Sequence, residues 1–132
     1  IETGCASADL IVCATNSPQP VVHGAWVKPG THTDFLGNHH PEHSECDSAL
    51  VENAKVWVDS KTNCFREAGE ILIPIAEGKI NPEHILGDLA MLCRGEAPKR
   101  TSDDEITLFK SVGSALGDLA GARAVWEAQQ DR

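Results

Sequence analysis

The sequence lacks the features that mark several large classes of protein. Its 132 residues hold no apolar run of the ~18 residues that a membrane-spanning helix needs. The 11 Lys and Arg residues are scattered among 20 Asp and Glu, and the net charge is −9. A chain with this charge and no basic patch repels the phosphates of nucleic acids. We therefore expect neither a membrane nor a nucleic acid as a partner.

Paired cysteines are also missing. The five cysteines are odd in number and widely spaced, and no two of them form a C-x-x-C pair. This usage favours reduced thiols in a cytoplasmic protein over a disulfide framework. The chain opens with Ile1, and its single methionine is Met91. We expect it to be a piece of a longer polypeptide.

Three short stretches predict β-strands. Each is apolar or rich in β-branched residues: "ADLIVCAT", "THTDFLG" and "KVWVDS". The first is a continuous apolar run, which is typical of a strand buried on both faces of a parallel sheet. Two of the intervening segments predict helices, one through "SALVENA", capped by Asp47 or Ser48, and one through "KTNCFREAGE", ending near Gly69.

The second half of the chain predicts more helix. "NPEHILGDLAMLCRG" is expected to form one helix that ends at Gly95. The stretch from Ser102 onward predicts an Asp-rich helix start and then a long amphipathic helix. Glycines recur every four residues in that helix, so they share one face and favour close packing against another element: Gly113, Gly117 and Gly121. The alternation of strands and helices indicates an α/β protein with a parallel sheet.

Ligands of parallel α/β sheets bind outside the carboxyl ends of the strands. Two loops follow predicted strands and would lie at that edge: "ATNSPQP" and "LGNHHPEHSECD", residues 36–47, which we call the histidine loop. The glycine fingerprint G-x-G-x-x-G and the P-loop, which bind phosphates, are both absent from the sequence. The sequence therefore predicts a binding edge without a phosphate-binding loop.

Three motifs resemble one family throughout nearly the whole chain. "ADLIVCATNSPQPVVHGAWVKPGTHTDFLG", "VWVDS…EAGEILIPIAEGKI" and "RTSDDEITLFKSVGSALGDLAGA" are similar, in order, to the C-terminal half of the ornithine cyclodeaminase/mu-crystallin family. The resemblance implies the second half of a Rossmann-type NAD(P)-binding domain in residues 1–98. It implies C-terminal helices in 99–132 that return to an N-terminal substrate and dimerisation domain. The expected assembly is a homo-oligomer.

The resemblance also implies a reaction and the residues that serve it. The family transfers hydride between NAD or NADP and a carbon that bears an amine or imine, so a small amino or imino acid is the expected substrate. Val112 is expected to face the substrate. The cofactor-binding residues expected from the match are Thr15, Thr33, Asp34, Phe35, Leu36, His43 and Ser111, with the backbone of 33–36 lining the nicotinamide side.

The histidine loop departs from the family pattern. In the cyclodeaminases and alanine dehydrogenases of the family that this chain resembles, this loop has the pattern Gly-small-Asp-x-Pro-x-Lys. The Asp of that pattern is the proposed proton-transfer group. Aligned on Gly37 and Pro41, the Asp position is His39 and the Lys position is His43. This favours an imine reductase over an ornithine cyclodeaminase. His39 is then either the catalytic acid or base or a solvated residue, because imidazole exchanges protons near neutral pH.

Other interpretations of the sequence remain open. His39, His43 and Cys46 have spacing that would suit zinc on a helix, but Pro41 interrupts any such helix, so we expect no metal site. A catalytically inactive binding or structural fragment, like mu-crystallin in the lens, is a further alternative. Lys110 is either a surface charge or a link to another domain.

Overall fold

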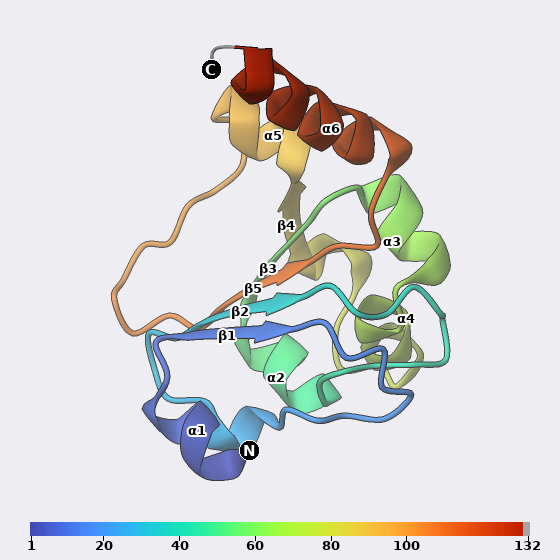
Figure 1. Ribbon diagram of the computed structural model, residues 1–132. Coiled ribbons are helices and arrows are strands. Elements are labelled where there is room, and N and C mark those ends of the chain that lie inside the picture. The colour runs from blue at the N-terminus through green and yellow to red at the C-terminus, as the bar shows by residue number, and fades with distance from the viewer. Residues whose placement is uncertain (131–132) are drawn as a thin grey trace.

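The computed structural model describes residues 1–130 and contains one parallel β-sheet (Figure 1). The five strands lie in the order β1-β2-β5-β3-β4, and every pair of neighbours is parallel. Their bounds are β1 Leu10–Cys13, β2 His32–Phe35, β3 Lys55–Val58, β4 Ile85–Asp88 and β5 Thr107–Lys110. The predicted α/β fold class and the three predicted strands are confirmed.

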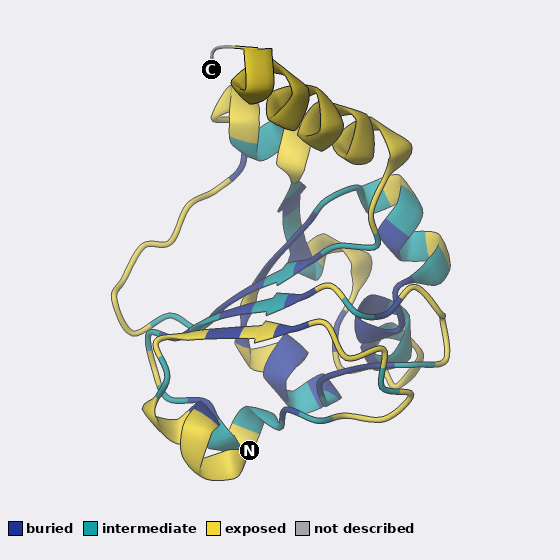
Figure 2. Cartoon of the chain, viewed as in Figure 1, coloured by how far each residue is buried: buried dark blue, intermediate teal, exposed yellow. Residues whose placement is uncertain are grey.

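Most of the helices cover one face of this sheet (Figure 2). They are short: α1 Glu2–Ser7, η1 Gly24–Trp26, α2 Ser48–Asn53, α3 Lys61–Glu67 and α4 Gly69–Ala76. The core lies between them and the inward-facing strand residues, such as Phe35, Val56 and Leu108, which are fully buried. The predicted cap of α2 is confirmed, since the Asp47 side chain accepts a hydrogen bond from the Leu50 amide. The helix expected to end near Gly69 stops at Glu67, and Gly69 begins α4 instead.

The prediction of one helix over residues 81–95 is wrong in its middle. That stretch forms η2 (Pro82–His84), then β4, and then α5 (Leu89–Arg94). Asp88 is the last residue of β4, and its side chain caps α5 by accepting a hydrogen bond from the Met91 amide. The apolar residues that were assigned to one helix therefore belong partly to a strand and partly to a helix. Gly95 closes α5 in the left-handed conformation, as expected.

The Asp-rich segment is likewise not a helix start. Residues 102–104 form a turn, and Thr107–Lys110 form β5, which lies between β2 and β3 in the sheet. The helical pattern was misleading because the four residues of β5 are followed within a few positions by the long helix α6. Their apolar side chains fit the spacing of that helix and were assigned to it. The segment 99–132 thus contributes a central strand to the sheet, although it was expected to be helical. The division of the chain into two domains at residue 98 stays a prediction.

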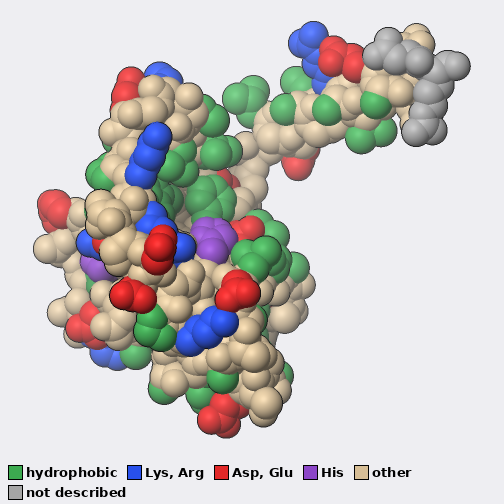
Figure 3. Space-filling model, turned by 90° about the vertical axis from the view of Figure 1, so that its left-hand side faces the viewer, with side chains coloured by type: hydrophobic (Ala, Val, Ile, Leu, Met, Phe, Trp, Pro, Cys, Tyr) green, Lys and Arg blue, Asp and Glu red, His purple; other side chains and the backbone are tan. Residues whose placement is uncertain are grey.

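The last helix, α6 (Ala115–Gln130), buries none of its residues and extends from the body as an arm (Figure 3). Within the described residues the glycines of α6 pack against no other element, since a side chain at Gly121 would meet nothing within 4 Å, and Gly113 lies before the helix. The expected close packing at this face stays a prediction. Leu116 and Trp126 are 79% and 67% exposed. Residues 1–130 contain no helix long and apolar enough to cross a membrane.

Candidate functional site

The carboxyl ends of three neighbouring strands bring the predicted site residues to one edge of the sheet. Thr15 follows β1, Leu36 follows β2 and Ser111 follows β5, and these strands are adjacent in that order (Figure 1). Backbone hydrogen bonds continue the sheet at this point: the Leu36 amide donates to the Cys13 carbonyl at 2.8 Å, and the Ser111 amide donates to the Phe35 carbonyl at 3.1 Å. This edge is where a parallel sheet binds its ligand.

Glu45 joins the first two of these loops. Its Oε1 accepts hydrogen bonds from the Thr15 amide at 2.5 Å and the Thr15 hydroxyl at 2.6 Å, and its Oε2 accepts one from the Gly37 amide at 2.7 Å. The carboxylate is fully buried, and these three donors replace the water it has lost. A side chain at position 37 would overlap Glu45 and the Asn16 amide, so only glycine fits there.

A buried ion pair lies directly beneath the histidine loop. Lys110, the last residue of β5, places its Nζ 2.9 Å from Oε2 of Glu70 in the first turn of α4, and both side chains are 0% exposed. The same Nζ donates to the Asn38 carbonyl at 2.6 Å. Oε1 of Glu70 accepts from the Glu45 amide at 3.0 Å. Both alternatives that the sequence left open for Lys110 are excluded by this position, since it is neither at the surface nor free to reach another domain.

Asp59 performs a similar task at the third loop. Its Oδ2 accepts hydrogen bonds from the Ser111 hydroxyl at 2.9 Å and from the amides of Val112 and Gly113 at 3.1 and 2.8 Å. The Cys64 thiol donates to Oδ1 at 3.3 Å. Burial, followed by the nearby Asp59 charge, raises the pKa of Cys64 to about 12. The thiol therefore stays protonated and serves as a structural donor.

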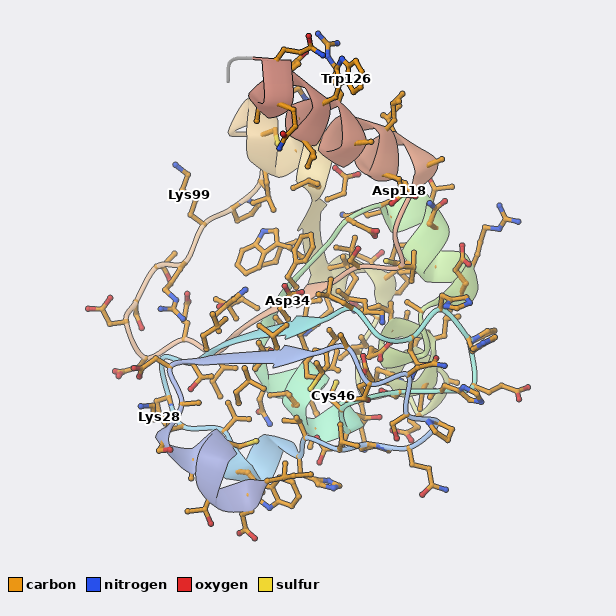
Figure 4. All side chains as sticks on the ribbon, in the orientation of Figure 1. Lys28, Asp34, Cys46, Lys99, Asp118 and Trp126 are labelled. Atoms are coloured by element: carbon orange, nitrogen blue, oxygen red, sulfur yellow. The ribbon has the colours of Figure 1, made fainter. Side chains whose placement is uncertain are left out.

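The residues of β2 divide between the two faces of the sheet. Thr33 and Phe35 point into the core, where the Thr33 hydroxyl donates to the Thr107 carbonyl at 3.1 Å. Asp34 points to the opposite face (Figure 4), where its Oδ1 is buried and has no hydrogen-bond partner within residues 1–130. Burial raises the pKa of this carboxyl. The side chains of Thr33 and Phe35 thus do not reach the edge, and their predicted cofactor contacts involve backbone alone.

The histidine loop carries its imidazoles on the outside of this framework. His39 and His40 are exposed, and their ring centroids lie 4.5 Å apart. The ring centroids of His40 and His43 lie 5.0 Å apart, with the rings edge to face. The His43 ring is partly buried, with an Nδ1 that has no partner within residues 1–130. The described part of the chain holds no group of three metal-ligating side chains.

An apolar hollow of about 400 Å³ lies away from this edge, on the sheet face that the short helices leave open. Trp57 and Phe109 form its floor, and Lys99, on the loop after α5, lies on its rim (Figure 4). None of the predicted site residues lines it. We place the candidate site at the strand ends because the predicted polar residues and the buried charges converge there.

Comparison with known proteins identifies the chain's relatives. The model of the ornithine cyclodeaminase/mu-crystallin family matches residues 1–132. The chain belongs to this family. It is 49% identical over 126 residues to a Delta(1)-pyrroline-2-carboxylate reductase of Colwellia psychrerythraea, covering 96% of this chain and 40% of that protein. It is 31% identical over 127 residues to the ketimine reductase mu-crystallin of mouse, a match that covers 96% of this chain and 38% of that protein.

A solved relative shows the same fold. The Delta(1)-pyrroline-2-carboxylate reductase of Thermococcus litoralis, in complex with NADH and L-proline, superposes with a TM-score of 0.89 at 36% identity. The match covers 98% of this chain and 40% of that one. This chain of the ornithine cyclodeaminase/mu-crystallin family thus spans about 40% of the length of its relatives.

Sequence reasoning missed the four charged residues that build the site's framework. Glu70, Lys110 and Asp59 lie inside or directly after apolar stretches, as in "AGEILIPIA" and "TLFKSV", whereas Glu45 lies in the polar histidine loop. A charged residue within an apolar strand or helix can be carried into the core with its neighbours. A buried charge then needs a partner of opposite charge or a set of hydrogen bonds. That signal indicates a network, but not which residues pair within it.

Proposed function

We propose that this chain is the nicotinamide-binding part of an NAD(P)-dependent reductase of cyclic imino acids, such as Δ1-pyrroline-2-carboxylate. The observation that carries the proposal is the convergence of Thr15, Leu36 and Ser111 at one edge of the parallel sheet. The 49% identity to a reductase of that substrate supports it. NAD or NADP supplies the hydride when it is bound.

The hydrogen bonds of the framework define what the two hydroxyls offer a cofactor. The Thr15 hydroxyl donates its proton to Glu45, and the Ser111 hydroxyl donates its proton to Asp59. Each oxygen also accepts a hydrogen bond from a backbone amide, that of Ser17 for Thr15 and that of Gly113 for Ser111, both at 3.2 Å. One lone pair of each oxygen therefore remains to accept from a ligand. Thr15 accepts from a hydroxyl of the cofactor's ribose region, and Ser111 accepts from an N–H or O–H group of the cofactor. Leu36, 46% exposed between them, offers apolar contact to the nicotinamide side.

The remaining predicted residues complete the site around this position. The backbone of Thr33, Asp34 and Phe35 leads to the edge along β2, and His43, within the histidine loop, offers the cofactor its partly buried ring. Val112 faces the substrate. It follows Ser111, and its amide is fixed by Asp59. These roles hold the imino acid beside the nicotinamide.

His39 carries the proton in this proposal. Reduction of an imine adds a hydride to carbon and a proton to nitrogen, so the site needs an acid near the ring nitrogen. The exposed imidazole of His39, on the loop that Lys110 holds, provides that proton. A cyclodeaminase uses a carboxylate at this position, and none is present. The reductase is therefore favoured over ornithine cyclodeamination.

The setting of the protein is part of the same proposal. All five cysteines are free, and four of them are buried, which fits a reducing cytoplasm. The substrate is a small imino or amino acid, and the protein acts as a homo-oligomer. The chain by itself is expected to be inactive, since it carries no glycine-rich pyrophosphate loop.

Calorimetry with NADH and NADPH tests the proposal. We expect tight binding by a polypeptide that joins this chain to the part its relatives carry in addition, and turnover of pyrroline- or piperideine-2-carboxylate rather than ornithine. Thr15→Val should weaken NADH binding, whereas Thr62→Val, at an exposed position of helix α3, should not. Absence of binding in the joined polypeptide would sink the oxidoreductase proposal.

A further inference from the structure

We infer that Lys110, Glu70 and Glu45 form a buried positioning network, which sets the histidine loop relative to the Thr15 loop. The inference rests on the proposed function for the reaction that this arrangement serves. Lys110 is then a positioning residue: it acts on His39 through the backbone of Asn38 and touches no substrate.

The first step of the argument is the cost of the arrangement. Lys110, Glu70 and Glu45 are all 0% exposed, and together they bring two negative charges and one positive charge into the interior. Burying such groups is unfavourable unless geometry and hydrogen bonds compensate for the lost water. Replacing both members of such a buried pair by hydrophobic side chains is often neutral or stabilising. The charges therefore indicate a requirement other than core stability.

The second step is where the network's hydrogen bonds end. Lys110 Nζ holds the Asn38 carbonyl, one residue before His39. Glu70 holds the Glu45 amide, and the Glu45 carboxylate holds the amides of Thr15 and Gly37. Each contact fixes backbone at the sheet edge. The network thus holds the loops after β1 and β2, which belong to different strands, in one arrangement.

A side-chain contact joins the same two loops from above. The Asn38 amide nitrogen donates to the Ser17 carbonyl at 2.5 Å. Asn38 is fully buried. Its backbone carbonyl accepts a hydrogen bond from Lys110, and its side chain donates one to the loop after β1. Displacement of the Asn38 carbonyl would therefore shift both Thr15 and His39. The cofactor residue and the proton-transfer residue are coupled through one lysine.

Amide hydrogen exchange on the full chain tests this network without any cofactor. Glu45→Gln keeps the Lys110–Glu70 pair and nearly the same shape, but its NH2 group faces an N–H donor on one side. We expect exchange at Gly37 or Thr15 to accelerate about tenfold or more, as expected for one lost charged hydrogen bond. Lys110→Met should accelerate both. In Glu45→Gln, amides in the middle of β3, such as Val56, should change far less than those of the loops. In Lys110→Met, Val56 reports the loss of global stability, and the loop amides should accelerate beyond it. Lys55→Met, an exposed lysine, is the matched control.

The outcomes separate this inference from the proposed function. Unchanged exchange at Gly37 and Thr15 in Glu45→Gln, or acceleration by the same factor throughout β3, would overturn the positioning network. In the joined polypeptide, Glu45→Gln should lower kcat more than it raises KM, since the loops are misplaced in the reacting complex. If the exchange result holds but the unmodified polypeptide binds no NADH, the network stands and the proposed function fails.

Discussion

Lys110 Nζ lies 2.9 Å from Glu70 Oε2, and neither side chain is exposed to solvent. The pair joins the end of the central strand β5 to the start of α4, so it sits between the sheet and the helix layer that covers it. Removing one partner of a buried ion pair leaves an uncompensated charge, whereas replacing both can be neutral or stabilising. The pair is therefore better understood as a device for arrangement than as a source of stability.

This asymmetry gives a prediction for stability. Lys110→Met should lower the free energy of unfolding by about 3–5 kcal/mol, because Glu70 is left buried without its positively charged partner. Lys110→Met combined with Glu70→Met should recover part of that loss, since no unpaired charge remains, although the Glu45 amide and the Asn38 carbonyl lose their partners. Urea denaturation of both variants, with the exposed Lys55→Met as control, checks the prediction. A double variant no more stable than the single one would contradict it.

A second prediction concerns the support of the histidine loop. An added Cβ at Gly69 would overlap the carbonyl of His43 and come within 2.9 Å of the His40 carbonyl. Both contacts are to backbone, which cannot rotate away as a side chain can. Gly69→Ala should therefore destabilise the fold by about 1–3 kcal/mol and alter the NMR signals of the loop histidines. Gly4→Ala, where a Cβ meets nothing within 4 Å, is the matched control: it should not destabilise the fold, because alanine favours helix α1, and it should leave the histidine signals unchanged.

The sequence predicted those parts of the fold whose signals are local. The strand β1 and the cap at Asp47 were predicted because each depends on neighbouring residues. The expectation that β1 is buried on both faces is wrong, because β1 is an edge strand whose Leu10 and Val12 are 59% and 55% exposed. The strand β5 was missed because "TLFK" is short and is followed by a long helical pattern. The strand β4 was missed for a different reason: apolar residues at 85, 89 and 92 satisfy helical spacing even though a strand and a helix share them.

The candidate site was predicted in its position but not in its construction. The rule that ligands bind at the carboxyl ends of parallel strands located Thr15 and the histidine loop. The contacts between Glu45 and Thr15, or between Lys110 and Asn38, join segments far apart in the chain. Their pairing depends on strand order, which places β5 beside β2, and no local pattern encodes that order.

The third prediction addresses the loop after β5. Asp59→Ala should remove the acceptor of the Ser111 hydroxyl and of the amides of Val112 and Gly113. We expect a loss of about 1–3 kcal/mol of unfolding free energy and faster exchange of these two amides. Asp103→Ala, in an exposed turn, is the control. Exchange at Val112 and Gly113 that matches the unaltered chain would show that Asp59 does not hold this loop.

The buried thiols give a prediction for pH dependence. Burial raises the pKa of Cys13 to about 11 and that of Cys64 to about 12, from an ordinary value of 9.0. The folded state thus holds these protons more tightly than the unfolded state. Their contribution to stability is complete below pH 9 and is lost as the pH rises toward 11 and 12. Urea unfolding between pH 8 and pH 11 should show this decline, and Cys64→Ala should make it shallower; an identical slope would contradict the assignment.

The same thiols differ in reactivity at neutral pH. Cys93 is exposed on α5, whereas Cys5, Cys13, Cys46 and Cys64 are buried. Iodoacetamide at pH 8 should modify Cys93 in the folded chain and all five cysteines after denaturation. Mass spectrometry of peptides separates the two patterns. Rapid modification of Cys64 in the folded chain would show that the packing around Asp59 is looser than the structure indicates.

The last prediction concerns association through β1. This strand pairs on one side with β2 and is an edge of the sheet, and its outward-facing Leu10 and Val12 are 59% and 55% exposed. An exposed apolar edge strand pairs readily with another chain. We expect the isolated chain to self-associate in sedimentation, and Val12→Lys to shift it toward the monomer. Val125→Lys, at 65% exposure on α6, distinguishes the two apolar surfaces, since it should leave association through β1 intact. A monodisperse monomer for the unaltered chain would exclude both surfaces as self-association sites.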